Sequence, residues 1–255
     1  MLESISSAVA DISLPQLAVI ACMALFASVV GGVSGYGTGA LMPLVLVPIL
    51  GPEPVVPIVA ISALFNNTSR AVAYRPAIDW RRVILVLPIA LPTTILGAWI
   101  YTLLSGRGVA LLIGSVLIAS VPARRFFKSR GFSLSDRGLT ATSFGWGMLA
   151  GGTSGAGIML LSMLMAAGLQ GAAVIATDAV ISLGVGLAKV ATFGLAGALG
   201  PRDVAVAVLM GSMAMPGAFL ARLLVDRMPL HVHTAILDAV VIAGGGVMIA
   251  AALTR

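Results

Sequence analysis

Three ionisable residues, Arg70, Asp178 and Lys189, interrupt long apolar stretches of this 255-residue chain. Ionisable side chains inside such stretches are energetically costly, so they tend to face a cavity or one another and to mark a path for ions or substrates. Asp178 lies four residues before Ser182, which places both side chains on one face of a helix. Asp178 is therefore a candidate proton-coupling carboxylate. A structural pairing with a backbone or hydroxyl donor is the alternative.

Two glycine-rich stretches are candidates for anion binding. Residues 31–37 read GGVSGYG and residues 151–157 read GGTSGAG. No strand pattern precedes them and no Lys-Ser or Lys-Thr pair follows, which excludes a soluble nucleotide-binding loop. A Gly/Ser break between two half-helices leaves backbone groups and a helix N-terminus free at mid-membrane, where they bind ions. The alternative is close helix packing through the small residues Gly31, Gly35 and Gly39.

The predicted substrate site combines these glycine stretches with the polar residues of the third apolar segment in each half of the chain. The half-helix N-termini near residues 37–39 and 157–159 would hold a small anion beside Ser34, Ser154, Asn66 and Asn67. The complete set of predicted substrate-binding residues is Ser34, Gly35, Gly37, Thr38, Ser62, Asn66, Asn67, Arg70, Thr153, Ser154, Gly155, Gly157, Ser182 and Lys189.

Composition places these residues in a membrane protein. The residues AVILMFWYC make up 59% of the chain, only 9% is charged, and the mean hydropathy is +1.10. Soluble proteins carry about 25% charged residues, which cover their surface. The net charge of +6 does not indicate nucleic-acid binding, because the cations lie in short loops between apolar segments. That distribution is typical of cytoplasmic loops in membrane proteins.

The sequence assembles no site for a metal, a cofactor or covalent catalysis. Cys22 is the single cysteine, and His231 and His233 are two residues apart at one loop, which points them away from each other on a helix. No nucleophile, base and acid converge, so we expect a protein that is not an enzyme. Asp238 is a further acid with the same two interpretations as Asp178, but it lies nearer a loop.

The chain contains an internal duplication. At an offset of 120 residues the two glycine stretches coincide at five of seven positions, and Ile61-Ser62 coincides with Ile181-Ser182. We predict two transmembrane repeats, 13–125 and 135–254, that form one integrated membrane domain. The expected helical segments are 15–31, 38–50, 54–75, 82–104 and 108–123 in the first repeat, and 138–151, 157–169, 172–196, 203–224 and 232–253 in the second.

The fold class follows from the length of these segments and the position of the charges. A 13-residue helix is only about 20 Å long, against a hydrocarbon core of about 30 Å. The segments beside each glycine stretch are thus half-helices that meet within the membrane, or strongly tilted crossings. Either way each repeat has an odd number of crossings, so the second is inverted. We expect an all-α polytopic membrane protein with two inverted repeats, each a Gly-broken helical hairpin plus three transmembrane helices.

With an odd number of crossings in each repeat, most cations lie on one face of the membrane, which we assign to the cytoplasm. The cations on that face are Arg75, Arg81, Arg82, Arg124, Arg125, Lys128, Arg130, Arg137 and Arg227, and those on the other face are Arg107, Arg202 and Arg255. Inversion also directs Arg70 and Lys189 toward opposite faces, as expected of cations at the two entrances of an anion path. The alternative for both is that they extend along the apolar surface to the membrane interface.

With the repeat established, nearly the whole chain resembles the TauE/SafE family of sulfite and organosulfur anion exporters. The similarity rests on the duplicated unit, Pro43 after the first glycine stretch, the polar segment at Ile61-Ser62, Ile78-Asp79-Trp80, and the small-residue helices at 94–98 and 216–222. The chain departs from the family's run of three glycines. The resemblance implies secondary transport of a small sulfur oxyanion or sulfonate across the cytoplasmic membrane of a bacterium.

The predicted function is therefore an alternating-access transporter of a small anion, with protons or another coupling ion and the lipid bilayer as its partners. The first alternative is a passive anion channel of the same architecture. An intramembrane enzyme and a scaffolding subunit of a larger complex rank below it. The sequence leaves the oligomeric state open.

Overall fold

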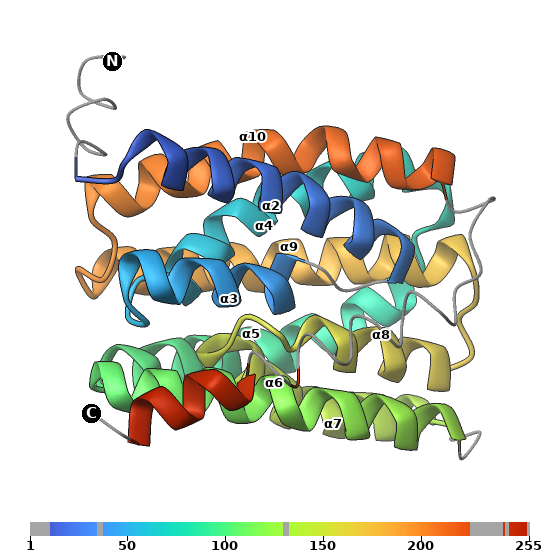
Figure 1. The fold of residues 1–255 in the computed structure, drawn as a ribbon. Coiled ribbons are helices and arrows are strands. Elements are labelled where there is room, and N and C mark those ends of the chain that lie inside the picture. The colour runs from blue at the N-terminus through green and yellow to red at the C-terminus, as the bar shows by residue number, and fades with distance from the viewer. Residues whose placement is uncertain (1–10, 35–37, 130–132, 225–241, 243–244, 254–255) are drawn as a thin grey trace.

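The computed structural model describes residues 11–34, 38–129, 133–224, 242 and 245–253, and every long element among them is an α-helix. The helices lie roughly parallel in one elongated bundle (Figure 1). Their bounds are α2 Leu14–Ser34, α3 Thr38–Leu50, α4 Val55–Ala73, α5 Trp80–Thr102, α6 Gly106–Ser129, α7 Asp136–Gly152, α8 Gly157–Ala166, α9 Ala172–Leu195 and α10 Pro201–Leu224. A short 3-10 turn, η1 (Arg75–Ala77), precedes α5, and residues 245–253 are also helical. The all-α prediction is confirmed for the described residues.

Most described helix ends lie within three residues of the predicted segments, and the end of α6 differs most. α6 continues to Ser129, six residues beyond the apolar stretch, and its last turns carry Arg and Lys residues, which favour a helix. α8 ends at Ala166 rather than at residue 169. Gly168 and Gly171 there adopt φ angles of 94° and 54°, which other residues rarely reach, and these two glycines turn the chain into α9.

The long helices pack in a row whose order is symmetric under the duplication. The counterparts α2 and α7, α10 and α5, and α4 and α9 occupy mirrored places in this row. α2 packs against α10, α10 against α4, α4 against α9, α9 against α5, and α5 against α7. Two separate apolar clusters fill this arrangement. One lies around Met42, Ile58 and Met210, and the other lies around Leu160 and Ile181. The contact between α4 and α9 joins the two halves of the chain at the centre.

Glycines allow the outer helix pairs to approach closely. A Cβ atom on Gly97 of α5 would lie 2.1 Å from the carbonyl oxygen of Met148 in α7, and one on Gly217 of α10 would lie 2.7 Å from the Cβ of Ser28 in α2. Gly97 and Gly217 are separated by the same 120 residues that separate Ser28 and Met148. The α5–α7 and α2–α10 contacts are thus corresponding contacts under the sequence duplication.

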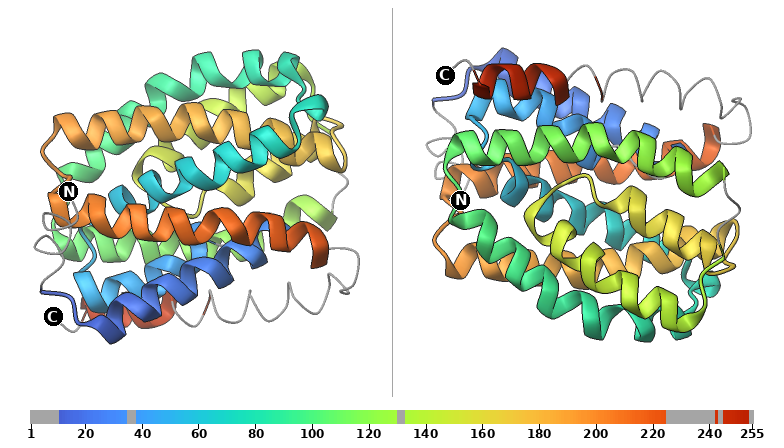
Figure 2. Two further views of the ribbon diagram at one scale, coloured as in Figure 1. Left: turned by 90° about the horizontal axis from the view of Figure 1, so that it is seen from above. Right: turned by 90° about the horizontal axis from the view of Figure 1, so that it is seen from below.

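The second glycine stretch interrupts a helix, because residues 153–156 separate α7 from α8. α3 begins at Thr38, directly after the first glycine stretch. The helices that follow are short, with 13 residues in α3 and 10 in α8, or about 20 Å and 15 Å of rise. α3 runs from the middle of the bundle toward the end where α2 begins, and α8 runs toward the opposite end, where α7 begins (Figures 1 and 2). We call these the α2 end and the α7 end.

The surface of the bundle is apolar along its length. Among the described residues, α4, α5 and α9 are long and apolar enough to cross a membrane. Large hydrophobic side chains such as Ile84, Phe144 and Leu187 are exposed between the helix ends. A soluble protein rarely exposes so many, because their contact with water is unfavourable.

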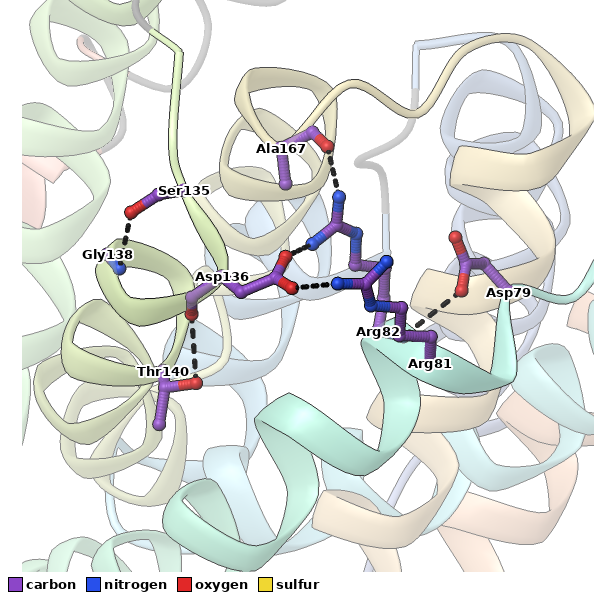
Figure 3. A network of polar contacts seen from close by, with 8 residues as sticks. All are labelled: Asp79, Arg81, Arg82, Ser135, Asp136, Gly138, Thr140 and Ala167. Carbon is purple, nitrogen blue, oxygen red and sulfur yellow. Dashed lines mark hydrogen bonds and ion pairs between the residues drawn. The ribbon is translucent and has the colours of Figure 1, made fainter.

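A polar network closes the α7 end. Asp136, the first residue of α7, binds both Arg81 and Arg82 of the first turn of α5 (Figure 3). Arg82 also donates from Nη2 to the carbonyl oxygen of Ala167, 2.8 Å away, just beyond α8. The two helix starts are capped by Asp79, which accepts from the backbone of Arg82, and by Ser135. We call this set the end network. It joins the first half of the chain to the second.

Candidate functional site

A cavity of about 140 Å³ lies between the two halves of the chain, near the centre of the bundle. Its walls are the first turn of α3, one face of α4, the end of α7, the break at 153–156, the first turn of α8 and one face of α9. The predicted site residues that line it are Thr38, Asn66, Asn67, Arg70, Thr153, Ser154, Gly155, Gly157, Asp178, Ser182 and Lys189. The fold thus brings together residues from four separate stretches of sequence.

The remaining predicted site residues either do not line the cavity or lie outside the described residues. Ser62 is buried but is not part of the cavity wall. Gly35, Gly37 and the side chain of Ser34 lie outside what the structure describes, as do His231, His233 and Asp238. The site is therefore built here mainly from the second glycine stretch and from the polar faces of α4 and α9.

Arg70 and Asp178 form an ion pair in the cavity wall. Nη2 of Arg70 lies 3.0 Å from Oδ2 of Asp178, and the two side chains are only 10% and 4% exposed. Nη1 of Arg70 also donates to Oδ1 of Asn67 at 3.4 Å, while Ser182 donates to Asp178 at 3.5 Å. Since Arg70 belongs to α4 and Asp178 to α9, the pair joins the two halves of the chain inside the bundle.

Lys189 is a second buried cation, without a carboxylate partner among the described residues. Its side-chain Nζ donates to the carbonyl oxygen of Thr153, 2.8 Å away, in the break between α7 and α8. The residue is 7% exposed, so the ammonium group faces the cavity wall rather than the membrane interface. A bound anion would supply the counter-charge that the protein does not place beside it.

Arg70 and Lys189 approach the cavity from opposite ends of the bundle. Arg70 lies one turn before the end of α4, and Lys189 lies within two turns of the end of α9. α4 ends at the α7 end and α9 ends at the α2 end (Figure 1). Both cations are buried, so neither extends along the apolar surface to the membrane interface.

The N-termini of both half-helices meet this cavity. Thr38, Gly39 and Ala40 of α3 and Gly157 and Ile158 of α8 line it. The first backbone N–H groups of a helix have no partner within the helix and carry a partial positive charge, so two such ends attract an anion. Both ends therefore reinforce the positive potential that Arg70 and Lys189 create.

Close contacts hold the second break in place. A Cβ on Gly39 would lie 2.0 Å from the carbonyl oxygen of Ser154, so only glycine allows α3 to approach the break this closely. Nε1 of Trp146 donates to the carbonyl oxygen of Ala156 at 2.9 Å. The hydroxyl of Thr153 donates to the carbonyl oxygen of Leu149 within α7. The break is thus a fixed part of the wall.

The Ser154 hydroxyl is a buried group in this wall with no hydrogen-bond partner among the described residues. A buried hydroxyl without a partner costs free energy, because it loses its bonds to water. An oxyanion in the cavity would accept a hydrogen bond from it. The cavity therefore provides two kinds of donor for an anion, charged groups and a neutral hydroxyl.

The sequence interpretation missed Trp146 and the end network. Trp146 lies five residues before Gly151, and its position beside the glycine stretch was the available signal. Arg82 and Arg202 are separated by 120 residues, each beside the start of a helix in its repeat. Arg202 pairs with Asp11 at 3.0 Å, as Arg82 pairs with Asp136. The two arginines correspond under the duplication, whereas their partners Asp11 and Asp136 are 125 residues apart, so only the arginine positions were a signal for the network.

Within the described parts of the chain, no three His, Cys, Asp or Glu side chains come together as a metal site.

A family model described as "Sulfite exporter TauE/SafE" matches residues 20–251 of this chain. No curated protein and no solved structure matches this chain.

Proposed function

This chain belongs to the sulfite exporter TauE/SafE family, and we propose that it moves a small sulfur oxyanion or sulfonate by alternating access. The family consists of membrane transporters rather than enzymes, which agrees with the apolar surface of the bundle. The chain is thus an integral membrane protein of an anion exporter family.

The observation that carries the proposal is the central cavity. It combines two buried cations from opposite halves, Arg70 and Lys189, with the N-termini of two half-helices. Broken helices whose ends meet at the bilayer midplane are a recurrent way to bind an anion in transporters. We assign substrate binding to the predicted residues that line the cavity and, from the sequence pattern, to Ser34, Gly35, Gly37 and Ser62.

Alternating access is supported by the correspondence between the two halves. The order of helix contacts is symmetric about α4 and α9, and the close contacts of Gly97 and Gly217 recur at the duplication offset. α3 and α8 point toward opposite ends of the bundle (Figure 2). These relations support two inverted repeats, 13–125 and 135–254, which rock about a fixed site.

Asp178 is the proposed proton-coupling group. Its ion-pair partner Arg70 also lines the cavity in which the anion would bind. An anion that draws Arg70 away leaves the Asp178 carboxylate without its counter-charge, and protonation then neutralises it. The anion and the Asp178 carboxylate thus compete for one arginine, so anion binding favours protonation of Asp178, and this couples the movements of substrate and proton.

We place the protein in the cytoplasmic membrane of a bacterium, with the α7 end in the cytoplasm. Arg75, Arg81, Arg82 and Arg137 lie on elements that begin at this end. Positively charged loops are retained on the cytoplasmic side during insertion.

Transport by the purified protein in proteoliposomes tests the proposal. Sulfite, sulfate, thiosulfate, sulfoacetate and taurine would be offered with a carboxylate control, with and without a pH gradient. We expect saturable, gradient-stimulated uptake of one sulfur anion, and loss of uptake in Lys189→Ala but not in the surface control Arg107→Gln. Linear uptake that no gradient accelerates would indicate a passive channel. No uptake of any anion would contradict the proposal.

The role of Asp178 has its own test. Asp178→Asn keeps the shape of the side chain and removes its proton-binding group, so we expect transport that no longer depends on the pH gradient. Transport by this variant with the full pH dependence of the original protein would remove Asp178 from the coupling mechanism.

A further inference from the structure

The charges in the cavity wall are unequal in number. Among the residues that the structure describes, the ionisable ones that line it are Arg70, Asp178 and Lys189. Arg70 and Asp178 neutralise each other at 3.0 Å, whereas Lys189 donates to the carbonyl oxygen of Thr153 and has no carboxylate partner among these residues. With all three groups ionised, the empty cavity has a surplus of one positive charge.

This surplus has energetic consequences because the ionisable residues that line the cavity are buried. Arg70, Asp178 and Lys189 are all at most 9% exposed as residues. Electrostatic energies are larger here than in water, and a surplus charge without a counter-ion is unfavourable. One negative charge balances the cavity, whereas two leave it with a surplus of the opposite sign.

We infer that, as long as Asp178 is ionised, the cavity selects its substrate by charge and takes singly charged oxyanions, such as a sulfonate or hydrogensulfite, in preference to dianions of the same shape. Protonation of Asp178 raises the surplus to two and removes this preference. The inference rests on the proposed function, because it assumes that the cavity is the anion site. Asp178 limits the substrate to one negative charge, since its carboxylate cancels one of the two cations. Lys189 supplies the charge that the substrate balances.

Neutral groups in the wall do not change this balance. Asn66, Asn67, Thr38, Ser154 and Ser182 provide hydrogen-bonding groups without charge. They suit the oxygens of a tetrahedral or pyramidal anion equally well whether it carries one charge or two. Shape and hydrogen bonding thus select the oxyanion class, and the three ionisable groups select within it.

Methanesulfonate and sulfate are matched probes for this inference. Both are tetrahedral at sulfur, and a methyl group in one replaces a charged oxygen in the other, so that near neutral pH they carry one and two charges. Their binding to the purified, detergent-solubilised protein is measured as the increase in unfolding temperature with ligand concentration, at one fixed neutral pH. We expect methanesulfonate to bind at least about tenfold more tightly than sulfate, since one unbalanced buried charge costs more than a factor of ten.

Variants change the surplus in both directions. Asp178→Asn raises it to two positive charges, and we expect sulfate affinity to increase by about tenfold or more relative to methanesulfonate. Lys189→Gln removes the surplus, and binding of both anions should be lost. The double variant Asp178→Asn/Lys189→Gln restores a surplus of one and should recover the preference for methanesulfonate. Glu53→Gln and Arg107→Gln make the same chemical changes at exposed positions and should alter neither affinity.

The outcomes separate the inference from the proposed function. Failure of the original protein and of all variants to bind either anion would overturn the proposed site itself. Tight binding of methanesulfonate and sulfate alike by the original protein would leave the site standing and overturn charge selection. Unchanged sulfate affinity in a folded Asp178→Asn protein that still binds methanesulfonate would also overturn it. The double variant keeps the test decisive if one single variant does not fold.

Discussion

Two polar contacts between the halves of this protein, one at the cavity and one at the α7 end, differ in burial. At the cavity, Arg70 meets Asp178 with side chains that are 10% and 4% exposed. In the end network, Asp136 is 33% exposed and Arg81 is 74% exposed. Both contacts link an arginine from the first half to an aspartate from the second.

This difference in burial determines which contact constrains the transporter. A buried charge that loses its partner is strongly destabilising, so the Arg70–Asp178 pair changes only when another charge replaces one member. An exposed pair exchanges its partner for water at little cost. The cavity pair is therefore suited to respond to an anion, and the end network is suited to open and close.

The largest effect should follow from breaking the cavity pair. Arg70→Met leaves the Asp178 carboxylate buried without a counter-charge, and we expect a loss of about 3–5 kcal/mol in the free energy of unfolding, together with loss of transport. Thermal unfolding in detergent and proteoliposome uptake measure the two effects. Arg70→Met/Asp178→Leu should be more stable than Arg70→Met alone and equally inactive. If Arg70→Met were as stable as the original protein, the comparison would fail.

A second effect should arise where α3 meets the break at 153–156. Gly39→Ala places a methyl group against the carbonyl oxygen of Ser154, so α3 must move, at a cost of about 1–3 kcal/mol. We also expect weaker anion binding, because the N-terminus of α3 leaves the cavity. The control is Gly145→Ala in α7, where a Cβ meets nothing within 4 Å. Equal unfolding temperatures for the two variants would show that this contact is not tight.

The elements of this fold were largely predictable, because apolar runs and glycine breaks determine helices in a membrane. The predicted segment 38–50 has the bounds of α3, and the predicted start of the segment at 172 is the start of α9. The polar residues that line the cavity were also largely predictable, since a polar residue in an apolar run tends to face a cavity.

The partners within the site were not predictable. Arg70 and Asp178 were given separate roles, as an entrance cation and as a proton carrier, and nothing in the local sequence shows that they meet. Their contact depends on how α4 crosses α9, which is set by packing, such as Gly186 against Leu64. Likewise, the bond from Lys189 to Thr153 depends on the shape of a break that has no regular structure.

A smaller effect should follow from Arg82→Ala in the end network. This change removes the ion pair with Asp136 and the hydrogen bond to Ala167, and we expect a loss of about 1–2 kcal/mol, because a charged donor leaves a backbone acceptor unpaired. The opening of the α7 end should also become easier. Cysteine accessibility of the cavity from the cytoplasmic side, measured at Ser182→Cys in a Cys22→Ser background, should increase. Unchanged accessibility would restrict Arg82 to a structural role.

The smallest effect should come from Arg81→Ala, and it separates the two arginines that bind the same carboxylate. Arg81 is 74% exposed whereas Arg82 is 16% exposed, and Arg82 alone has a second acceptor at Ala167. Exposed ion pairs contribute little and are screened by salt, so the unfolding temperature should change by less than about 2 °C and the change should vanish at high ionic strength. A loss as large as that of Arg82→Ala would mean that Asp136 needs both arginines. In that case exposure would no longer explain why the cavity contact and the end network differ.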